Sequence, residues 1–236
     1  MTPPGTPFAV YLFDIDGTLV NAAGAGRRAF ERAVAEHCGP VNGALAGLRL
    51  DGMTDRLIVR EALKLLGRPF DDGLCDRLLG RYVEHLRGEL QGPGYAVLPG
   101  VVAALEALHA RAAVVGLCTG NVVDGARLKL AHGGLDRYFD WGATAVCGFA
   151  ADGEARERLV HAAIRRATSL LGRSVEPREA LVIGDTPRDV DAAHHAGVPV
   201  LAVATGRYGA DDLRAAGADH VVPSLESPEA LRILLG

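Results

Sequence analysis

The amino-acid sequence predicts an α/β fold: a parallel sheet covered by helices on both faces, with an inserted helical domain. Short apolar runs typical of buried strands alternate with segments that have helical spacing of apolar residues, which is the pattern of parallel strands joined by crossover helices. One interval, from about 21 to 95, breaks this alternation because it contains no convincing strand. We therefore expect a core domain made of residues 1–20 and 97–236, and an all-helical cap domain made of residues 21–96.

The individual elements follow from periodicity and from turn residues. Strands are expected at the apolar runs 8–13, 113–118, 180–183 and 198–203, with a weaker one at 219–222. Helices between these strands are expected at 99–110, 122–132, 155–171 and from about Pro187. Helices of the inserted domain are expected at 25–38, 54–66 and 73–90, separated by Gly and Pro.

Composition and charge exclude several classes of protein. The chain is 49% hydrophobic and 23% charged, which is typical of an ordinary globular protein. A net charge of −4 gives no basic surface for nucleic acid. The N-terminal sequence lacks the pattern of a signal peptide and no apolar segment reaches membrane length, so we expect a cytoplasmic protein. Its expected state is a monomer or a homodimer. Four widely spaced cysteines without a CxxC pair predict buried free thiols.

Two aspartates follow the first predicted strand, in the sequence FDIDGTLV at 13–20. Side chains at positions i and i+2 of an extended segment share a face, so Asp14 and Asp16 project together. They lie at the carboxyl end of the strand, where parallel sheets bind ligands. An Asx turn with a helix cap would explain one aspartate but not two at the end of a buried strand. Because close carboxylates repel each other, the pair requires a shared proton or a cation.

Other strand ends add further polar groups. The run LVIGDTPRDV at 181–190 places Asp185 after a strand and Asp189 on the helix that follows. Four carboxylates at one edge indicate a hard cation, for which Mg²⁺ is the expected cofactor. The run LCTGN at 117–121 adds Thr119, Gly120 and Asn121, whose hydroxyl and N–H groups could receive an anionic oxygen, although ordinary turn chemistry explains them equally well.

In this order and at these distances, DIDGTLV, CTGN and GDTPRD resemble the motifs of the haloacid dehalogenase superfamily of phosphohydrolases. The resemblance covers the whole chain, and a helical insertion after the first motif is similar to members with a small helical cap. GMTDRLIVREAL at 52–63 and ATGRYGADDLRAAGAD at 204–219 look most like the phosphoglycolate phosphatase-like group. The resemblance implies a Rossmann-like core and a Mg²⁺-dependent phosphatase. Its substrate would be a small phosphate ester, for which 2-phosphoglycolate is the favoured candidate, and cleavage would pass through an aspartyl-phosphate.

The resemblance also implies roles for individual residues. Asp14 would be the nucleophile, and Asp16 would protonate the leaving alcohol and then activate water. Mg²⁺ would be held by Asp14, the backbone carbonyl of Asp16 and Asp185. Asp189 would complete the metal shell or order a metal-bound water, and which of Asp185 and Asp189 is the direct ligand stays open. Thr119 would bind a phosphoryl oxygen.

The chain departs from the family's commonest pattern at one catalytic position. Relatives usually have a lysine between the second and last motifs, but residues 140–184 contain none, and only Lys64 and Lys129 are lysines in the whole chain. An arginine is therefore expected to pair with the phosphate. Arg156, at a predicted helix start in GEARERLV, is our choice because arginine donates in a bidentate fashion, and Arg158 is the alternative.

Two other candidates have simpler explanations. Thr54 and Asp55 lie at a predicted helix start in the cap. If the cap selects the leaving group, Thr54 would contact the substrate phosphate, but N-capping of the helix explains these residues equally well. The pair His194 and His195 is expected to lie on a helix surface, because imidazole is a poor ligand for a hard cation.

Four other functions are weighed against the phosphatase. A metal-free dehalogenase would not need Asp16, and a β-phosphoglucomutase-like phosphotransferase would keep the same motifs without releasing phosphate. A silent regulatory module would not keep every carboxylate. A receiver domain would need neither a helical cap nor an acid at position 16.

Overall fold

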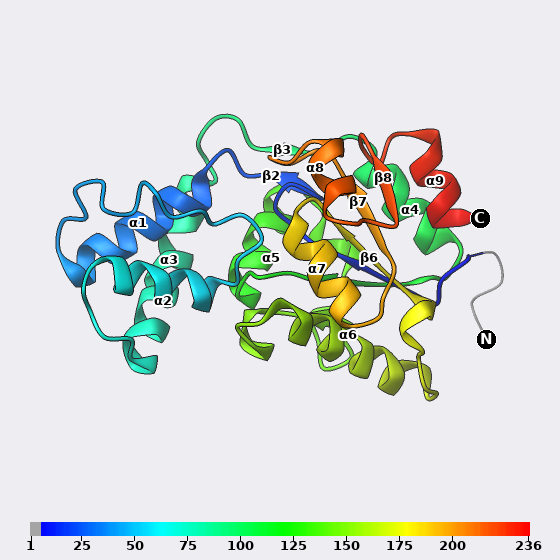
Figure 1. Ribbon diagram of the computed structural model, residues 1–236, viewed down its shortest axis with the longest axis horizontal. Helices are drawn as coiled ribbons and strands as arrows, with labels where there is room; N and C mark the ends of the chain where they lie inside the picture. Colours follow the sequence, from blue (N-terminus) through cyan, green and yellow to red (C-terminus); the bar gives the residue numbers. More distant parts are fainter. Residues whose placement is uncertain (1–5) are drawn as a thin grey trace.

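The computed structural model describes residues 6–236, in which a helix-covered parallel sheet carries a helical layer at one end (Figure 1). Within these residues the sheet has six strands in the order β5-β4-β1-β6-β7-β8, all pairing in parallel. The strands are β1 (Val10–Phe13), β4 (Val114–Cys118), β5 (Cys147–Gly148), β6 (Ala180–Gly184), β7 (Val200–Val203) and β8 (His220–Val222). The predicted α/β fold class is confirmed, and of these six strands only the two-residue β5 was not expected.

Helices cover both faces of this sheet. One face packs against α4 (Val101–Ala110), α5 (Val123–His132) and α9 (Pro228–Leu235). The other face packs against α6 (Arg156–Leu171), α7 (Pro187–His195) and α8 (Ala210–Ala215). Strand β1 sends Tyr11 and Phe13 into the first apolar cluster and Val10 and Leu12 into the second. A strand buried on both faces has no polar alternation, which is why β1 is an unbroken apolar run.

The register of the strands brings several loops to one edge of the sheet. Phe13 of the central strand β1 pairs with Leu117 of β4 on one side and with Ile183 of β6 on the other. The segments that follow these residues therefore emerge side by side. The chain winds outward from β1 in both directions, and ligands bind beyond the carboxyl ends of strands in such sheets.

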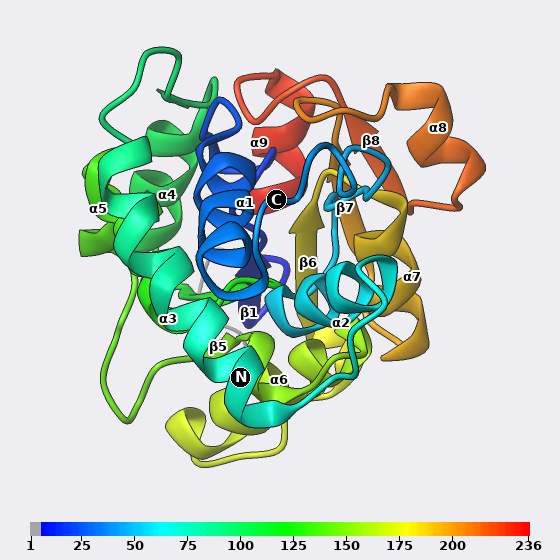
Figure 2. The same ribbon diagram turned by 90° about the vertical axis from the view of Figure 1, so that its left-hand side faces the viewer.

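The inserted segment lies in front of this edge (Figure 2). It folds, in this part of the described chain, into α1 (Ala25–Cys38), α2 (Asp55–Leu65) and α3 (Asp72–Glu89). The three helices bury an apolar cluster of their own, which includes Val34, Leu63, Leu78 and Leu86. Because these side chains pack on one another rather than on the sheet, the helical layer has its own core.

A pair of short antiparallel strands joins the helical layer to the sheet. They are β2 (Val20–Asn21) and β3 (Ala96–Val97), with Val20 opposite Val97. The sequence showed no convincing strand from 21 to 95, and the pair lies at the two ends of that interval. Both passages of the chain between the layers run through it. We propose that the boundary between the core domain (1–20 and 97–236) and the cap domain (21–96) lies at this pair.

The structure also bears on two features expected from composition. Cys75, Cys118 and Cys147 are buried, Cys38 is partly exposed, and none of the cysteines in the described chain forms a disulfide. The expected free thiols are confirmed, although one of them is not fully buried. Over residues 6–236, none of the helices combines the length and the apolar character needed to cross a membrane.

Candidate active site

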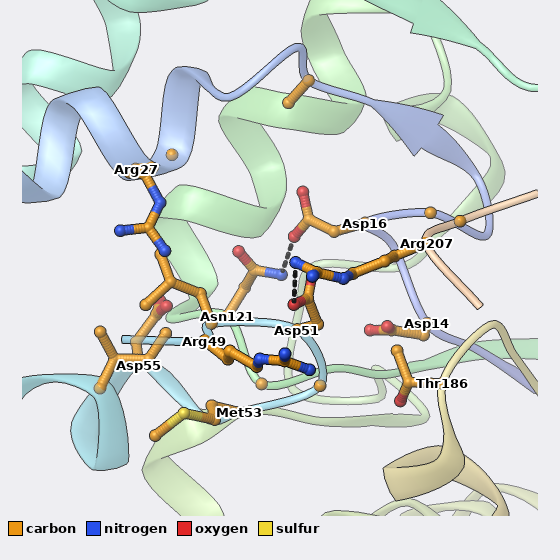
Figure 3. Close-up of a pocket in the computed structure, with 18 of the residues that line it drawn as sticks. Asp14, Asp16, Arg27, Arg49, Asp51, Met53, Asp55, Asn121, Thr186 and Arg207 are labelled. Carbon is orange, nitrogen blue, oxygen red and sulfur yellow. Dashed lines mark hydrogen bonds and ion pairs between the residues drawn. The ribbon is translucent and has the colours of Figure 1, made fainter. Parts of the chain in front are cut away.

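A cavity of about 740 Å³ lies between the carboxyl edge of the sheet and the cap (Figure 3). The loops after β1, β4, β6 and β7 form its floor, and α1 with the segment 46–53 forms its roof. Its lining includes most of the residues singled out from the sequence: Asp14, Asp16, Thr119, Gly120, Asn121, Arg156 and Asp185. Thr54 and Asp189 lie next to the cavity but do not line it.

Asp14 lies at the centre of the floor, directly after β1. Its backbone N–H donates to the carbonyl of Ile183 at 2.8 Å, which extends the strand pairing by one residue. The side chain is only 7% exposed, and its Oδ2 lies 3.1 Å from Nη2 of Arg156. Burial raises the pKa of Asp14 to about 6, against the opposing effect of Arg156. The ionised state of this carboxylate therefore depends on the cations around it.

Asp185 lies beside Asp14 in a space that two glycines leave open. A Cβ on Gly17 would lie 2.2 Å from the Asp185 Oδ2, and one on Gly206 would lie 1.7 Å from the same atom. The hydroxyl of Thr18 donates to Oδ1 at 3.2 Å. Burial and two neighbouring carboxylates raise the pKa of Asp185 well above its ordinary value. Only glycine at both positions lets the backbone approach this carboxylate so closely.

Asp189 completes a buried acidic group but is already occupied by protein donors. Asp14, Asp185 and Asp189 each place a carboxylate oxygen within 4.8 Å of the others. Oδ2 of Asp189 accepts from the N–H and the hydroxyl of Thr186 at 3.0 and 2.7 Å, and Oδ1 accepts from Arg156. Asp189 is thus placed to orient Arg156, whereas Asp185 faces the cavity.

Arg156 occupies the first turn of α6, as the sequence predicted. Besides Asp14 and Asp189, its guanidinium reaches the cap, where Nη1 donates to the carbonyl of Gly52 at 3.2 Å. Arg158 is exposed and packs against the backbone at Gly153, so it does not reach the cavity. Of these two arginines, only Arg156 lines the cavity, and its contact with a phosphate stays a prediction.

The segment 119–121 forms the wall after β4. Thr119 is fully buried, and its hydroxyl accepts from the side-chain amide of Asn121 at 2.8 Å. Gly120 lies against the cap, since a Cβ there would come within 2.2 Å of the carbonyl of Met53. All three residues line the cavity, and their contact with a phosphoryl oxygen stays a prediction.

Asp16 is held by a residue that the sequence analysis did not single out as part of the site. Its Oδ2 accepts from the side-chain amide of Asn121 at 2.9 Å and from the ammonium of Lys129 at 2.5 Å. Lys129 lies on α5, far from Asp16 in sequence, so no local motif identified it. A lysine among apolar residues in LKLA at 128–131 of a helix that packs on the sheet was the one available signal.

Thr54 and Asp55 belong to the joint between cap and core. Thr54 is the N-cap of α2. Its hydroxyl accepts from the N–H of Leu57 and donates to the carbonyl of Glu154. The structure confirms the N-cap alternative for Thr54, and a contact of Thr54 with a substrate phosphate stays a prediction. Asp55 is buried and accepts from the N–H of Val122 at 2.7 Å, and burial raises the pKa of Asp55 to about 6.

Three further arginines line the roof and rim of the cavity. Arg27 donates to the backbone carbonyls of Leu45 and Leu48, so it holds the cap loop. Arg49 and Arg207 enter the cavity from opposite sides of Asp51 in Figure 3. The Arg207 guanidinium lies 3.8 Å from Asp51, a loose contact for an ion pair.

Comparison with known proteins agrees with this architecture. The sequence profile of haloacid dehalogenase-like hydrolases matches residues 8–197. A phosphoglycolate phosphatase of Rhodospirillum rubrum is 34% identical over 213 residues, which span 88% of this chain and 83% of that protein. One from Cupriavidus necator is 31% identical over 235 residues, 98% of this chain and 96% of that protein.

A solved structure shares the fold at lower identity. A predicted phosphatase from Clostridium acetobutylicum superposes with a TM-score of 0.68 at 23% identity, covering 93% of this chain and 95% of that chain. The profile match spans most of the chain, and the Rhodospirillum rubrum relative exceeds 30% identity over most of both lengths. The chain is therefore an enzyme of the haloacid dehalogenase-like hydrolase family.

Proposed function

We propose that the protein is a Mg²⁺-dependent phosphatase that hydrolyses a small phosphomonoester through an aspartyl-phosphate on Asp14. The substrate that we favour is 2-phosphoglycolate. The observation that carries the proposal is the position of the Asp14 carboxylate. It ends the central strand, faces the cavity, and lies 3.1 Å from the Arg156 guanidinium beside two more carboxylates. The proposed nucleophile, the arginine proposed to bind phosphate and the candidate metal site thus lie together.

The proposed chemistry has two steps on the same phosphorus atom. An oxygen of Asp14 attacks phosphorus, the ester P–O bond breaks, and the leaving oxygen takes a proton from Asp16. A water then gives its proton to Asp16 and attacks the aspartyl-phosphate, which releases inorganic phosphate and restores the Asp14 carboxylate. Arg156 and the segment 119–121 hold the phosphoryl oxygens during both steps.

The residues present fit a hard divalent cation. Asp14 and Asp185 are buried carboxylates with oxygens within 4.8 Å of each other. Burial and neighbouring carboxylates raise the pKa of both, an arrangement that a cation stabilises. We assign the ligands to these two carboxylates and to the backbone carbonyl of Asp16. When bound, Mg²⁺ would neutralise the charge shared by phosphate and nucleophile. Asp189 is assigned to Arg156, because protein donors already occupy both of its oxygens.

A second anionic group on the substrate would find partners at the rim. Within residues 6–236, Arg49 reaches the cavity without a carboxylate partner and Arg207 has only the loose 3.8 Å contact with Asp51. Arg27 and Arg156, in contrast, are held by protein acceptors. The carboxylate of 2-phosphoglycolate suits such side chains, because guanidinium binds carboxylates well. The names of the Rhodospirillum rubrum and Cupriavidus necator relatives support the same substrate.

The test is phosphate release from a panel of small phosphomonoesters that includes 2-phosphoglycolate. We expect release with Mg²⁺, none with EDTA, and a strong preference for esters that carry a carboxylate. Asp14→Asn removes the nucleophile but keeps the side-chain shape, so it should abolish turnover while the circular dichroism spectrum stays unchanged. Turnover retained in this variant contradicts the assignment of Asp14. A folded wild-type protein that releases no phosphate from any ester, but interconverts sugar phosphates, would instead be a phosphotransferase.

A further inference from the structure

A buried lysine lies directly behind the proposed acid-base residue. Lys129 is 4% exposed, and its Nζ donates to Asp16 Oδ2 at 2.5 Å and to Asn121 Oδ1 at 2.7 Å. Burial of an ammonium group is costly unless it is fully paired. The chemistry assigned above to Asp14, Asp16 and Arg156 does not use this side chain, so its burial calls for a separate explanation.

The surroundings of Lys129 keep it charged. The carboxylates of Asp16 and Asp55 face it, and the hydroxyl of Tyr82 from α3 lies nearby. Burial alone would lower the pKa of Lys129, but these neighbours outweigh it and the pKa is raised above its ordinary value. A charged donor therefore contacts Asp16 from the side away from solvent.

The hydrogen bonds leave the two oxygens of Asp16 in different situations. Lys129 and Asn121 both donate to Oδ2, while within residues 6–236 no side-chain donor reaches Oδ1. Lys129 also determines how Asn121 is turned, because the amide oxygen must face the ammonium and the amide nitrogen then faces Asp16 and Thr119. The side chain of Asp16 is 44% exposed, so the unbonded oxygen can meet a ligand in the cavity.

We propose that Lys129 is a positioning residue that holds one carboxylate oxygen of Asp16 so that the other is presented to the leaving-group oxygen of the substrate. This inference rests on the proposed phosphatase function. It makes the role of Lys129 specific to proton transfer, and it separates Lys129 from Arg156, which acts on the nucleophile and the phosphoryl group.

The proposal predicts a dependence on the leaving group. An alkyl phosphate such as 2-phosphoglycolate needs a proton on its leaving oxygen, whereas p-nitrophenyl phosphate leaves as a stable phenolate and needs little help. The ratio kcat/KM reports the steps up to the first bond cleavage, so it isolates this proton transfer. General acid catalysis contributes about 10²- to 10⁴-fold, so its impairment should be visible for the alkyl ester alone.

The experiment compares Lys129→Met with Lys64→Met, a change at the other lysine of the chain, which is exposed on α2. We expect Lys129→Met to lower kcat/KM for 2-phosphoglycolate, or for the best alkyl ester, by roughly 10²-fold. For p-nitrophenyl phosphate we expect a change within a few-fold, and Lys64→Met should change neither value.

Equal losses on both esters in a folded Lys129→Met protein overturn the proposal, because they indicate a structural role. So does unchanged activity on both. If Lys129→Met does not fold, Lys129→Leu, which also removes the ammonium donor, replaces it in the same comparison. Failure of the phosphatase assignment looks different, because the wild-type protein would then release phosphate from neither ester.

Discussion

The guanidinium of Arg156 contacts three acceptors at once: Asp14, Asp189 and the carbonyl of Gly52. A lysine has a single nitrogen and cannot reach acceptors that lie on different sides. Arg156→Lys should therefore lower kcat on the order of 10²-fold, as loss of an oriented donor to the transition state does. The check is steady-state phosphate release, with Arg158→Lys as the control two residues further on. A wild-type kcat in Arg156→Lys would show that the several N–H donors of the guanidinium are not needed for catalysis.

The buried Asp55 gives a prediction about stability and pH. Burial raises its pKa to about 6 from 3.8, so between these values the folded chain binds more protons than the unfolded chain. The contribution of the protonated Asp55 carboxyl to the free energy of unfolding is fully present below about pH 4 and is lost as the pH rises through 6. Asparagine cannot ionise and still accepts from Val122, so Asp55→Asn should unfold less readily at pH 8, by on the order of 2 kcal/mol.

The measurement is urea unfolding of wild type and Asp55→Asn from about pH 4 to pH 8. The difference in free energy of unfolding should shrink towards zero at the acid end. Asp72→Asn is the control, because Asp72 also begins a cap helix but its side chain is 79% exposed. A difference that is the same at every pH would contradict the assignment of this effect to the Asp55 carboxyl.

How much of the site follows from sequence depends on how each residue is placed. Asp14, Asp16, Asp185 and the segment 119–121 follow strands, and parallel strands bring their carboxyl ends together whatever the details of packing. Lys129 reaches Asp16 only because α5 packs beside β1, a fact of tertiary geometry that no local pattern records. Thr54 was ambiguous for a related reason, since the same sequence pattern caps a helix and contacts a ligand.

At the scale of elements, the turn between β6 and α7 couples helix capping to the site. Thr186 is the N-cap of α7, and its hydroxyl donates to Asp189 Oδ2 at 2.7 Å while accepting from Asp189 N–H. Thr186→Ala should cost about 1 kcal/mol in the free energy of unfolding. It should also lower kcat, because Asp189 then orients Arg156 less well.

Thr186→Ser keeps the hydroxyl and is the matched control for both measurements. Thermal unfolding and phosphate release are the readouts. A loss of stability without any loss of activity would show that the cap of α7 does not influence the site.

The elements themselves were largely predictable. Long periodic segments such as α1 and α6 lie within a residue of their expected bounds, because an amphipathic face determines them. The strands β2, β3 and β5 have two residues each and bury too few side chains to leave a pattern. Their pairing is decided by tertiary contacts, which sequence periodicity does not record.

At the scale of the whole molecule, close backbone contacts connect cap and core. Asp55 N–H donates to the carbonyl of Gly120 at 2.7 Å, and Arg60 of α2 forms a bidentate ion pair with Glu154 of the core. The Arg156 bond to the carbonyl of Gly52 adds a contact from the lining of the cavity. The contacts that join cap and core therefore include residues that line the cavity itself.

Gly120→Ala tests this coupling, because the new Cβ would lie 2.2 Å from the Met53 carbonyl and 2.9 Å from the Thr54 Cα, both in backbone of the cap. Backbone atoms cannot rotate away, so the cap must move. We expect a larger radius of gyration by small-angle scattering and a lower kcat/KM. Gly80→Ala, on a cap helix with nothing within 4 Å of the added Cβ, should leave both unchanged and stabilise the helix by about 0.5–1 kcal/mol. A Gly120→Ala protein with the radius of gyration of wild type would contradict this expectation. It would show that small local shifts accommodate the added Cβ and that the position of the cap does not depend on this contact.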